Sequence, residues 1–213
     1  MIYRFTVLIL LFCVSAMLTG CSALFSAQEL SENYALMEGV QSTVPQAIDG
    51  KLNTVGETTF PASTEGFMGA NAASQVVITL PEKKVIRKIV IHSDNLSQFD
   101  IYADQGSITA NEDWKLIKDV KSVKRSPIEV SLLIPFPTNR VRLRVLGTKD
   151  DALLNRQQRA RSGGFRGWNT GNRRAAAKIR EIELYGYKTA QQVEAEEATD
   201  KREKELDDLL DLE

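Results

Sequence analysis

The sequence has very few of the residues from which catalytic and redox sites are built. Among 213 residues there are two cysteines and one histidine, His92. One histidine cannot form a cluster of histidine and cysteine metal ligands, and no serine–histidine–aspartate arrangement can be assembled around it. His92 ends an apolar stretch, where a histidine is more often structural than catalytic because a general base needs a partner within reach. Acidic residues are plentiful, so counting does not exclude a two-carboxylate glycosidase, but no spacing supports one. The sequence therefore favours a protein that is not an enzyme.

The longest apolar run lies at the N-terminus. Phe5–Met17 follows Arg4 and has the length of a signal-peptide hydrophobic region, which is shorter than a membrane-spanning helix. The next four residues, Leu18–Cys21 (LTGC), resemble the bacterial lipobox, whose cysteine is diacylated and becomes the new N-terminus. An uncleaved transmembrane anchor is the alternative interpretation. The sequence predicts a lipoprotein signal peptide over residues 1–20 and acylation of Cys21, for example with palmitate.

Lipidation of Cys21 determines where we expect the protein to be. Two acyl chains hold a protein firmly on a membrane, whereas one holds it marginally. Residues 21–32 then form a tether. Ser22 follows the cysteine where an aspartate would favour the inner membrane, so the lipoprotein pattern favours the outer membrane of a bacterial cell envelope. Cys13 leaves with the signal peptide, and the mature chain is therefore expected to contain no disulfide.

Charge is nearly balanced overall but unevenly placed. Without Arg4 the chain has 26 basic and 28 acidic residues, a net charge of −2, which argues against a general nucleic-acid-binding protein. Residues 147–180 contain nine basic and two acidic residues, whereas residues 187–213 contain four basic and ten acidic ones. A basic segment is therefore followed by an acidic one.

The middle of the sequence has the pattern of short β-strands. In Arg140–Leu146, apolar residues alternate with arginines, which gives a strand one buried and one exposed face. Similar β-branched or aromatic stretches, separated by turn residues, occupy Gln75–Leu80, Val85–His92, Gln98–Ala103, Ile128–Ile134 and Lys178–Tyr185. Several short strands at this spacing predict an all-β sandwich or jelly roll.

Seven short motifs follow one another along this part of the chain. They are AIDG (47–50), NT (53–54), VVITLPEKKVIRKIVIHS (76–93), FDIYAD (99–104), Trp114, NRVRLRV (139–145) and IREIELYG (179–186). In this order they resemble the discoidin-like domain, also called the coagulation-factor type C or galactose-binding-like domain. Bacterial relatives of that domain serve as carbohydrate-binding modules. The resemblance predicts a discoidin-like jelly-roll β-sandwich over residues 33–187.

The sequence departs from the family pattern at two places. The family usually has a tryptophan shortly after the threonine of its Asp-Gly turn, whereas Val55 and Gly56 follow Thr54 here. The cysteine pair that brackets many animal members is also missing, which fits the bacterial branch. At Trp114 the family has a packing tryptophan, so we expect this side chain in the core.

The resemblance also implies a metal site. Related carbohydrate-binding members hold a structural calcium ion with the aspartate of the Asp-Gly loop, loop carbonyls and a glutamate from the closing strand. Asp49 and Glu181 match those positions, and Asn53 of the same loop completes the predicted ligand set. A tight turn with several inward carbonyl oxygens and one or two carboxylates suits a hard cation. The alternative is a plain turn in which Asp49 binds nearby backbone N–H groups.

Residues 156–174 (RQQRARSGGFRGWNTGNRR) have neither helical nor strand periodicity and predict a surface loop. Phe165 and Trp168 have no apolar neighbours, so they are candidates for stacking on a sugar ring or another protein. Arg166, Arg173 and Arg174 are candidate donors to a carboxylate, phosphate or sulfate. The ligand would be a carbohydrate, an anionic envelope component or an acidic protein. There are two alternatives: the acidic C-terminal segment masks the loop, or the loop is a simple spacer.

The last segment, residues 188–213, is predicted to be a charged helical tail because it lacks glycine and proline. It is either a solvated helix or a docking helix for a partner. Taken together, the sequence predicts a lipid-anchored, non-catalytic binding module that recognises a carbohydrate or another anionic envelope ligand, with no nucleic-acid partner. The alternative is an assembly lipoprotein that contacts other proteins through residues 147–180 and the acidic tail, without binding sugar.

Overall fold

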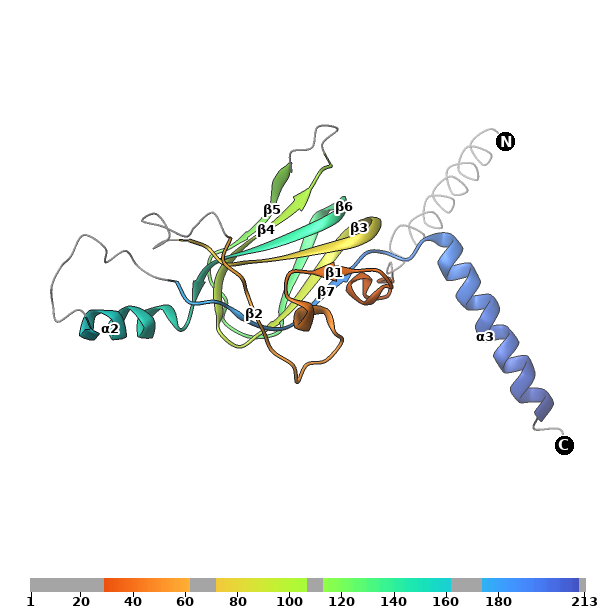
Figure 1. Cartoon of the computed structure of the whole chain (residues 1–213). Coiled ribbons are helices and arrows are strands. Elements are labelled where there is room, and N and C mark those ends of the chain that lie inside the picture. Colours follow the sequence, from red (N-terminus) through yellow and green to blue (C-terminus); the bar gives the residue numbers. More distant parts are fainter. Residues whose placement is uncertain (1–28, 62–71, 107–112, 162–173, 211–213) are drawn as a thin grey trace, which may run out of the picture. The chain divides into compact units, whose positions relative to one another are not determined.

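The computed structural model describes residues 29–61, 72–106, 113–161 and 174–210 (Figure 1). The chain divides into one compact unit, Leu30–Tyr187, and a second made of the chain before Leu30 and after Tyr187. Within the described residues of the second unit, α3 (Ala190–Leu210) is a helix. No helix in the described parts of the chain is both long and apolar enough to cross a bilayer.

The unit Leu30–Tyr187 is built from antiparallel strands. The strands are β1 (Gln41–Ser42), β2 (Gly56–Glu57), β3 (Gln75–Ser93), β4 (Leu96–Asp104), β5 (Trp114–Val120), β6 (Ile128–Thr148) and β7 (Lys178–Tyr185). Their order is β2-β7-β3-β6-β4-β5, and β1 pairs with β3. Two short 3₁₀ helices, η2 (Tyr34–Leu36) and η3 (Pro45–Ile48), precede β2, and the helix α2 (Asp151–Arg161) follows β6.

The two longest strands, β3 and β6, each run through both layers of a sandwich. Residues 75–79 of β3 pair with residues 140–144 of β6, and residues 88–91 pair with residues 128–131. The first half of β3 and the second half of β6 share their layer with β1 and β4, whereas the second half of β3 and the first half of β6 share theirs with β7. Both strands bend between these pairings, at one end of the domain, while α2 leaves from the other end (Figure 1). Strands that change sheet at a bend are one way to close a sandwich.

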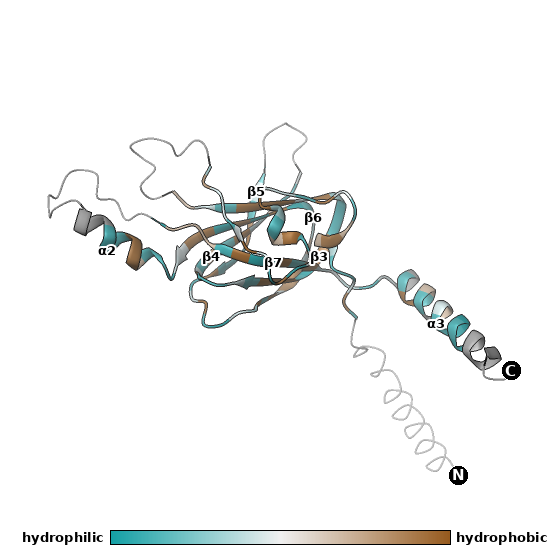
Figure 2. Ribbon diagram, turned by 60° about the horizontal axis from the view of Figure 1, so that its bottom comes forward, coloured by the Kyte–Doolittle hydropathy of each residue, from teal (hydrophilic) through white to brown (hydrophobic). Residues whose placement is uncertain are grey.

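The core lies between the two layers. Val76, Ile78 and Leu80 face inward from the first half of β3, and Ile89 and Ile91 face inward from its second half. The residues of β3 that face the core are therefore even-numbered before the bend and odd-numbered after it, because the register with β6 shifts between Ile86 and Lys88. Figure 2 shows the resulting alternation of hydrophobic and hydrophilic residues along the strands. Burial of these branched side chains is the main stabilising contribution, at roughly 1.5–3 kcal/mol for each.

The structure confirms the all-β prediction and corrects three details. The stretches predicted as separate strands on either side of Pro81 form the single strand β3, and those on either side of Pro135 form β6. Proline signals a break in a sequence, but here it accompanies a bend within a continuous strand. Residues 156–161, predicted as loop, belong to α2. Their arginines, glutamines and alanine have good helix propensity although they lack an apolar face.

The third correction concerns Trp114, which was expected in the core. It begins β5, an edge strand, and its side chain is only partly buried on the outer face of the sheet. The guanidinium groups of Arg140 and Arg142 lie 5.1 and 4.3 Å from its ring centroid. Cation–π contacts with two arginines of β6, two strands away in the same layer, therefore take the place of apolar packing.

Candidate functional site

Several connecting segments meet at the end of the sandwich from which α2 leaves, and Asn95 ties them together. Asn95 lies in the turn between β3 and β4 and is 4% exposed. Its Nδ2 donates to Asp150 Oδ2 at 2.8 Å and to the Ala176 carbonyl at 3.2 Å, while its Oδ1 accepts from the backbone N–H of Lys178 at 2.8 Å. One buried amide therefore joins the turn, the start of α2 and the segment that precedes β7.

Asp151 closes the base of the segment between β6 and β7. At the start of α2, its Oδ2 accepts from the Thr148 backbone N–H at 3.0 Å and its Oδ1 from the Thr148 hydroxyl at 2.7 Å. The same Oδ1 accepts from the backbone N–H of Ala175 at 2.8 Å. The two ends of residues 152–174 are therefore held together by one carboxylate, and α2 projects from this end of the domain (Figure 1).

A third buried contact fixes the segment before β7 to the chain before β3. The Thr58 hydroxyl donates to Ser74 Oγ at 2.7 Å and accepts from the backbone N–H of Ala177 at 2.7 Å. Thr58 and Ser74 are both buried. We call Asn95, Asp151 and Thr58, with their partners, the loop base. Each of its polar groups has a partner, so the loops start from fixed positions.

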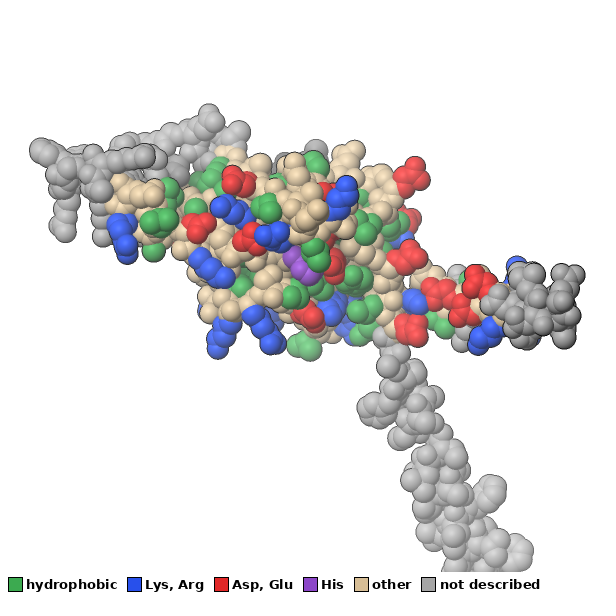
Figure 3. All heavy atoms as spheres, turned by 90° about the horizontal axis from the view of Figure 1, so that it is seen from below, with side chains coloured by type: hydrophobic (Ala, Val, Ile, Leu, Met, Phe, Trp, Pro, Cys, Tyr) green, Lys and Arg blue, Asp and Glu red, His purple; other side chains and the backbone are tan. Residues whose placement is uncertain are grey.

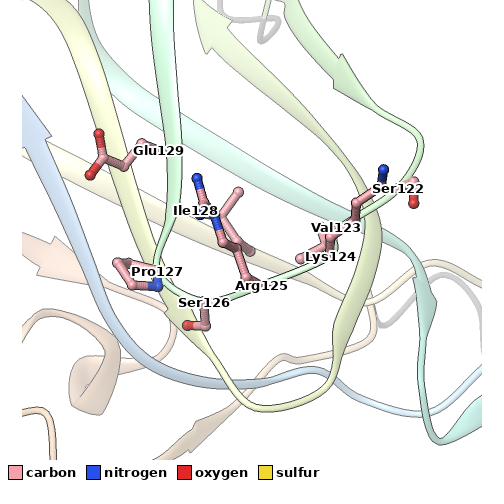
Figure 4. A pocket seen from close by; sticks show the side chains of 8 residues that line it. All are labelled: Ser122, Val123, Lys124, Arg125, Ser126, Pro127, Ile128 and Glu129. Carbon is pink, nitrogen blue, oxygen red and sulfur yellow. The ribbon is translucent and has the colours of Figure 1, made fainter.

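A hollow of about 680 Å³ lies beside the loop base, within the loop between β5 and β6. It is lined by residues 122–129, which include Lys124 and Arg125 (Figure 4). The loop is held to the β3–β4 turn, because the Val123 N–H donates to the Ser97 carbonyl at 2.9 Å and the Ser93 N–H donates to Ser126 Oγ at 3.1 Å. Over the face seen in Figure 3, basic and acidic side chains of the sandwich are interspersed.

Four of the predicted ligand-binding residues, Phe165, Arg166, Trp168 and Arg173, lie outside the described residues. Arg174 is the first described residue after them and is partly buried next to the loop base. Cys21, the predicted lipidation site, also lies outside the described residues. Sequence reasoning missed Asn95, Asp151 and Thr58, because their role depends on contacts between distant segments.

The predicted metal ligand Asp49 lies in a tight turn that follows η3. Its Oδ1 accepts from the Lys51 backbone N–H at 2.9 Å, and the Thr54 hydroxyl contacts Oδ1 and Oδ2 at 2.9 and 2.8 Å. Gly50 has φ +72°, a left-handed conformation that favours glycine. We call residues 49–54 the Asp49 turn. Asn53 is exposed in this turn.

The structure brings Glu181 of β7 to the Asp49 turn. Glu181 is 3% exposed, and its Oε2 accepts from the Gly50 backbone N–H at 3.1 Å. Its Oε1 is buried and has no hydrogen-bond partner among the described residues. Burial, reinforced by the negative charge of Asp49 and opposed by the Gly50 hydrogen bond, raises the pKa of Glu181 to about 7. A buried carboxyl oxygen without a partner is costly, and a bound cation would satisfy it.

These residues fit a hard cation as two of its ligands. Asp49 and Glu181 supply carboxylate oxygens, and a carboxylate has more acceptor positions than the turn contacts use. In the described parts of the chain, no group of three or more histidine, cysteine, aspartate or glutamate side chains could hold a metal. A cation here would therefore need backbone carbonyl, amide or hydroxyl oxygens as its further ligands.

The single histidine has a structural partner beside this turn. His92 of β3 is paired with Glu181 in the sheet, and its Nε2 lies 3.1 Å from Oε1 of Glu183. The Tyr185 hydroxyl donates to the other oxygen, Oε2 of Glu183, at 2.8 Å. Burial and this contact with Glu183 raise the pKa of Tyr185 to about 12. The three side chains share one face of β7 and β3, which only the register of the two strands reveals.

Comparison with known proteins identifies similar structures but no similar sequence. No protein-family model matches the chain, and no curated protein matches it. The family 32 carbohydrate-binding modules 1 and 2 of ZmpB from Clostridium perfringens, solved with GalNAc, align over 75% of this chain and 37% of theirs, with 18% identity and a TM-score of 0.51. Chitosan-binding module 1 of a Paenibacillus sp. IK-5 chitosanase/glucanase aligns over 73% and 100%, with 12% identity and a TM-score of 0.49. The family 32 module of Clostridium perfringens NanJ, solved with galactose, aligns over 74% and 100%, with 14% identity and a TM-score of 0.48.

The match to the Clostridium perfringens ZmpB modules confirms the predicted fold. Family 32 modules have the discoidin-like, galactose-binding-like β-sandwich, and the unit Leu30–Tyr187 has the same architecture. At 18% identity the match concerns the fold and not the ligand, because one sandwich can carry many functions.

Proposed function

We propose that the discoidin-like domain is a non-catalytic binding module that recognises a carbohydrate, preferably an anionic one, at the loop base. The observation that carries the proposal is the Asp151 clamp, which joins Thr148 to Ala175 and so fixes both ends of the intervening arginine-rich segment at one end of the domain. Loops on a rigid scaffold are where binding residues concentrate.

The residues around the loop base favour an anionic ligand. Lys124 and Arg125 line the hollow, and Lys149 and Arg174 flank the clamp. Arginine supplies several N–H donors that match a carboxylate or sulfate, and the aromatic residues Phe165 and Trp168 could stack on a sugar ring. The ZmpB modules were solved with GalNAc, which supports a sugar as the ligand class.

The anchor is a further part of this proposal. Leu18–Cys21 follows the apolar run directly, so Cys21 would carry the acyl chains and hold the domain at a bacterial envelope membrane. Ser22, which follows the cysteine, would direct the protein to the outer membrane. The Cys21→Ala precursor should remain uncleaved and unacylated. If its mass and its membrane fractionation equalled those of the wild type, the anchor would be disproved.

A structural calcium ion at Asp49 and Glu181 completes the proposal. The partnerless Oε1 of Glu181 supports it. The ion would hold the Asp49 turn against β7 and contribute stability rather than chemistry, with Asn53 as a third side chain able to supply an oxygen.

The test of ligand binding is a glycan array with neutral and acidic sugars, probed with the chain from Ala23 onward and run beside a pull-down from envelope extracts. We expect binding to acidic glycans, and its loss in Trp168→Ala and in Arg173→Ala/Arg174→Ala. The matched control is Lys83→Ala/Lys115→Ala, which removes two exposed positive charges away from the loop base. Equal weakening in the control would indicate nonspecific charge attraction.

Two other outcomes have a clear meaning. Capture of an acidic envelope protein with no signal from any glycan would replace the carbohydrate with a protein partner. Deletion of Glu194–Glu213 would reveal masking by the acidic tail if it strengthened binding at low salt and the gain shrank as salt rose. Binding that none of these variants changes would show that residues 156–174 are a spacer.

A further inference from the structure

The bend in β3 and β6 carries an unusually large bulge. Ile86 pairs with Phe136 and Lys88 pairs with Ser131, so Arg87 alone faces the four residues 132–135 of β6. The Arg87 guanidinium Nη1 donates to the carbonyls of Leu132 and Leu133 at 3.1 and 2.6 Å. Leu132 remains in the core, whereas the next two residues of the bulge, Leu133 and Ile134, have side chains without a neighbouring layer.

The bulge exposes large apolar side chains. Leu133 is 96% exposed, Ile134 is 79% exposed, and Val85, across the same bend, is 50% exposed. Pro135 and Pro137 of the same stretch of β6 are also exposed, and Pro137 pairs with Val85. We call Val85, Leu133 and Ile134, with these prolines, the apolar corner. Single exposed leucines are ordinary, but adjacent and almost fully exposed ones indicate a contact surface.

The apolar corner lies where the chain enters and leaves the domain. The Arg87 guanidinium that holds the bulge also lies 4.9 Å from the ring centroid of Tyr187, the last residue of the domain. Tyr187 in turn forms an antiparallel bridge with Leu30, the first residue. The loop base lies at the other end of the sandwich, as Figure 1 shows by the positions of α2 and of the bends in β3 and β6.

The length of chain before Leu30 limits how far this corner can be from a membrane. Eight residues, Ser22–Glu29, separate Cys21 from the domain. Fully extended, they span at most about 30 Å, at about 3.3–3.6 Å for each residue. A domain held by a lipid on Cys21 therefore stays within about one domain diameter of the bilayer, with Leu30 as its point of attachment.

The charges around the apolar corner also suit a membrane surface. Residues 81–88 and 129–137, which form the bend, contain Lys83, Lys84, Arg87 and Lys88 against Glu82 and Glu129, a net charge of +2. Basic residues next to exposed apolar ones favour the anionic headgroups of a bilayer interface.

We propose that the apolar corner inserts into the interface of the bilayer that holds the lipid anchor, so that the domain sits on the membrane with its loop base facing away. This rests on the proposed lipidation of Cys21. Leu133 and Ile134 would enter the boundary between headgroups and acyl chains, by about 5–10 Å. The net positive charge of the bend would attract the anionic headgroups.

The test places an environment-sensitive fluorophore on Leu133→Cys of the mature, lipidated protein in vesicles of phosphatidylethanolamine and phosphatidylglycerol. Leu153→Cys is the matched control, since Leu153 is also exposed but lies on α2. We expect a blue shift and quenching by lipid-borne nitroxide for the label at 133 and neither for the label at 153. Leu133→Cys combined with Ile134→Glu should lose most of both signals.

Thiol labelling of the parent protein separates failure of the anchor from failure of the corner. If Cys21 is acylated, the parent protein takes up no label and floats with the vesicles. If that holds and the labels at 133 and 153 remain equally exposed to water, the corner does not insert. Shielding of the label at 133 without vesicles, rising with protein concentration, would identify a second copy as the occupant and overturn the proposal.

Discussion

The loop base and the Asp49 turn are both held by polar side chains that accept hydrogen bonds from distant segments, and they differ in whether those side chains are satisfied. At the loop base, both ends of the Asn95 amide are hydrogen-bonded, as is each carboxylate oxygen of Asp151. At the Asp49 turn, the buried carboxyl of Glu181 has one bonded oxygen and one without a partner. The first region is complete within the chain, whereas the second is complete only with a proton or a cation.

This difference predicts that the largest loss of stability comes from substitutions at the loop base, where every hydrogen bond is made within the chain. Asn95→Ala leaves the Lys178 N–H and the Ala176 carbonyl without their partner inside the protein. We expect the free energy of unfolding to fall by about 2–4 kcal/mol, since an unsatisfied buried group costs its full desolvation. Urea denaturation measures it. The control Asn53→Ala, an exposed amide in the Asp49 turn, should change stability by less than about 0.5 kcal/mol when chelator is present.

A pH effect of similar size should come from Glu181. Its pKa is raised from the ordinary value 4.5 to about 7 in the folded protein. The associated stability is therefore fully present below pH 4.5 and is lost as the pH rises through 7, by up to about 3 kcal/mol. Melting temperatures in chelator should reveal this decline between pH 5 and pH 8. Glu181→Gln should remove this component, and an unchanged profile in that variant would show that Glu181 is not its source.

Calcium should stabilise the deprotonated form of the same carboxyl, which burial alone disfavours. A cation that binds only the folded state stabilises it by about 2.7 kcal/mol at a hundredfold excess over its dissociation constant. Calcium should therefore raise the melting temperature of the wild type at pH 8, and less at pH 5, where protonated Glu181 competes. Asp49→Ala should abolish the response. Identical melting of metal-free and calcium-loaded wild type would leave Asp49 as an ordinary turn residue.

The smallest effect is expected at Thr54, whose hydroxyl holds Asp49. Thr54→Val removes one exposed hydrogen bond, worth about 0.5–1.5 kcal/mol. In chelator, Asp49→Ala should reduce the effect of Thr54→Val, because the contact that these two residues share is already lost, whereas the Thr54 hydroxyl can still donate to the Lys51 carbonyl, at 2.8 Å. Fully additive losses in urea unfolding would mean that the contact with Lys51, and not the one with Asp49, accounts for the contribution of Thr54.

Strand positions could be predicted because burial leaves a pattern in the sequence. Lys178–Tyr185 was predicted as a strand and is β7, since its apolar residues and flanking turn are local signals. The continuity of β3 and β6 could not be predicted, because a bend and a chain reversal both contain proline and charged residues. The bulge at Arg87 was equally hidden, since it depends on which residue of β6 each residue of β3 meets.

In the candidate site too, residues with a local sequence signal could be predicted, whereas residues whose role depends on distant contacts could not. The Asp-Gly turn is a local signal, and the resemblance to the discoidin-like family paired Asp49 with the distant Glu181. The hydrogen bond between Gly50 and Glu181, which are 131 positions apart, supports this pairing. Asn95 gave no signal of its own. It follows an aspartate in an ordinary turn, and its importance depends on the arrival of Ala176 and Lys178 from a distant part of the chain.

The antiparallel contact between the first residues of the domain and the end of β7 has a mechanical consequence. Leu30 bridges Tyr187, the Ser31 N–H donates to the Gly186 carbonyl, and the Leu184 N–H donates to Asn33 Oδ1. If a ligand at the loop base were pulled away from an anchor before Leu30, the tension would run along β7. These bonds would then be loaded together in shear rather than opened one by one. A module attached in this way would resist detachment forces, such as those of flowing liquid, better than one whose first strand could be peeled from its end.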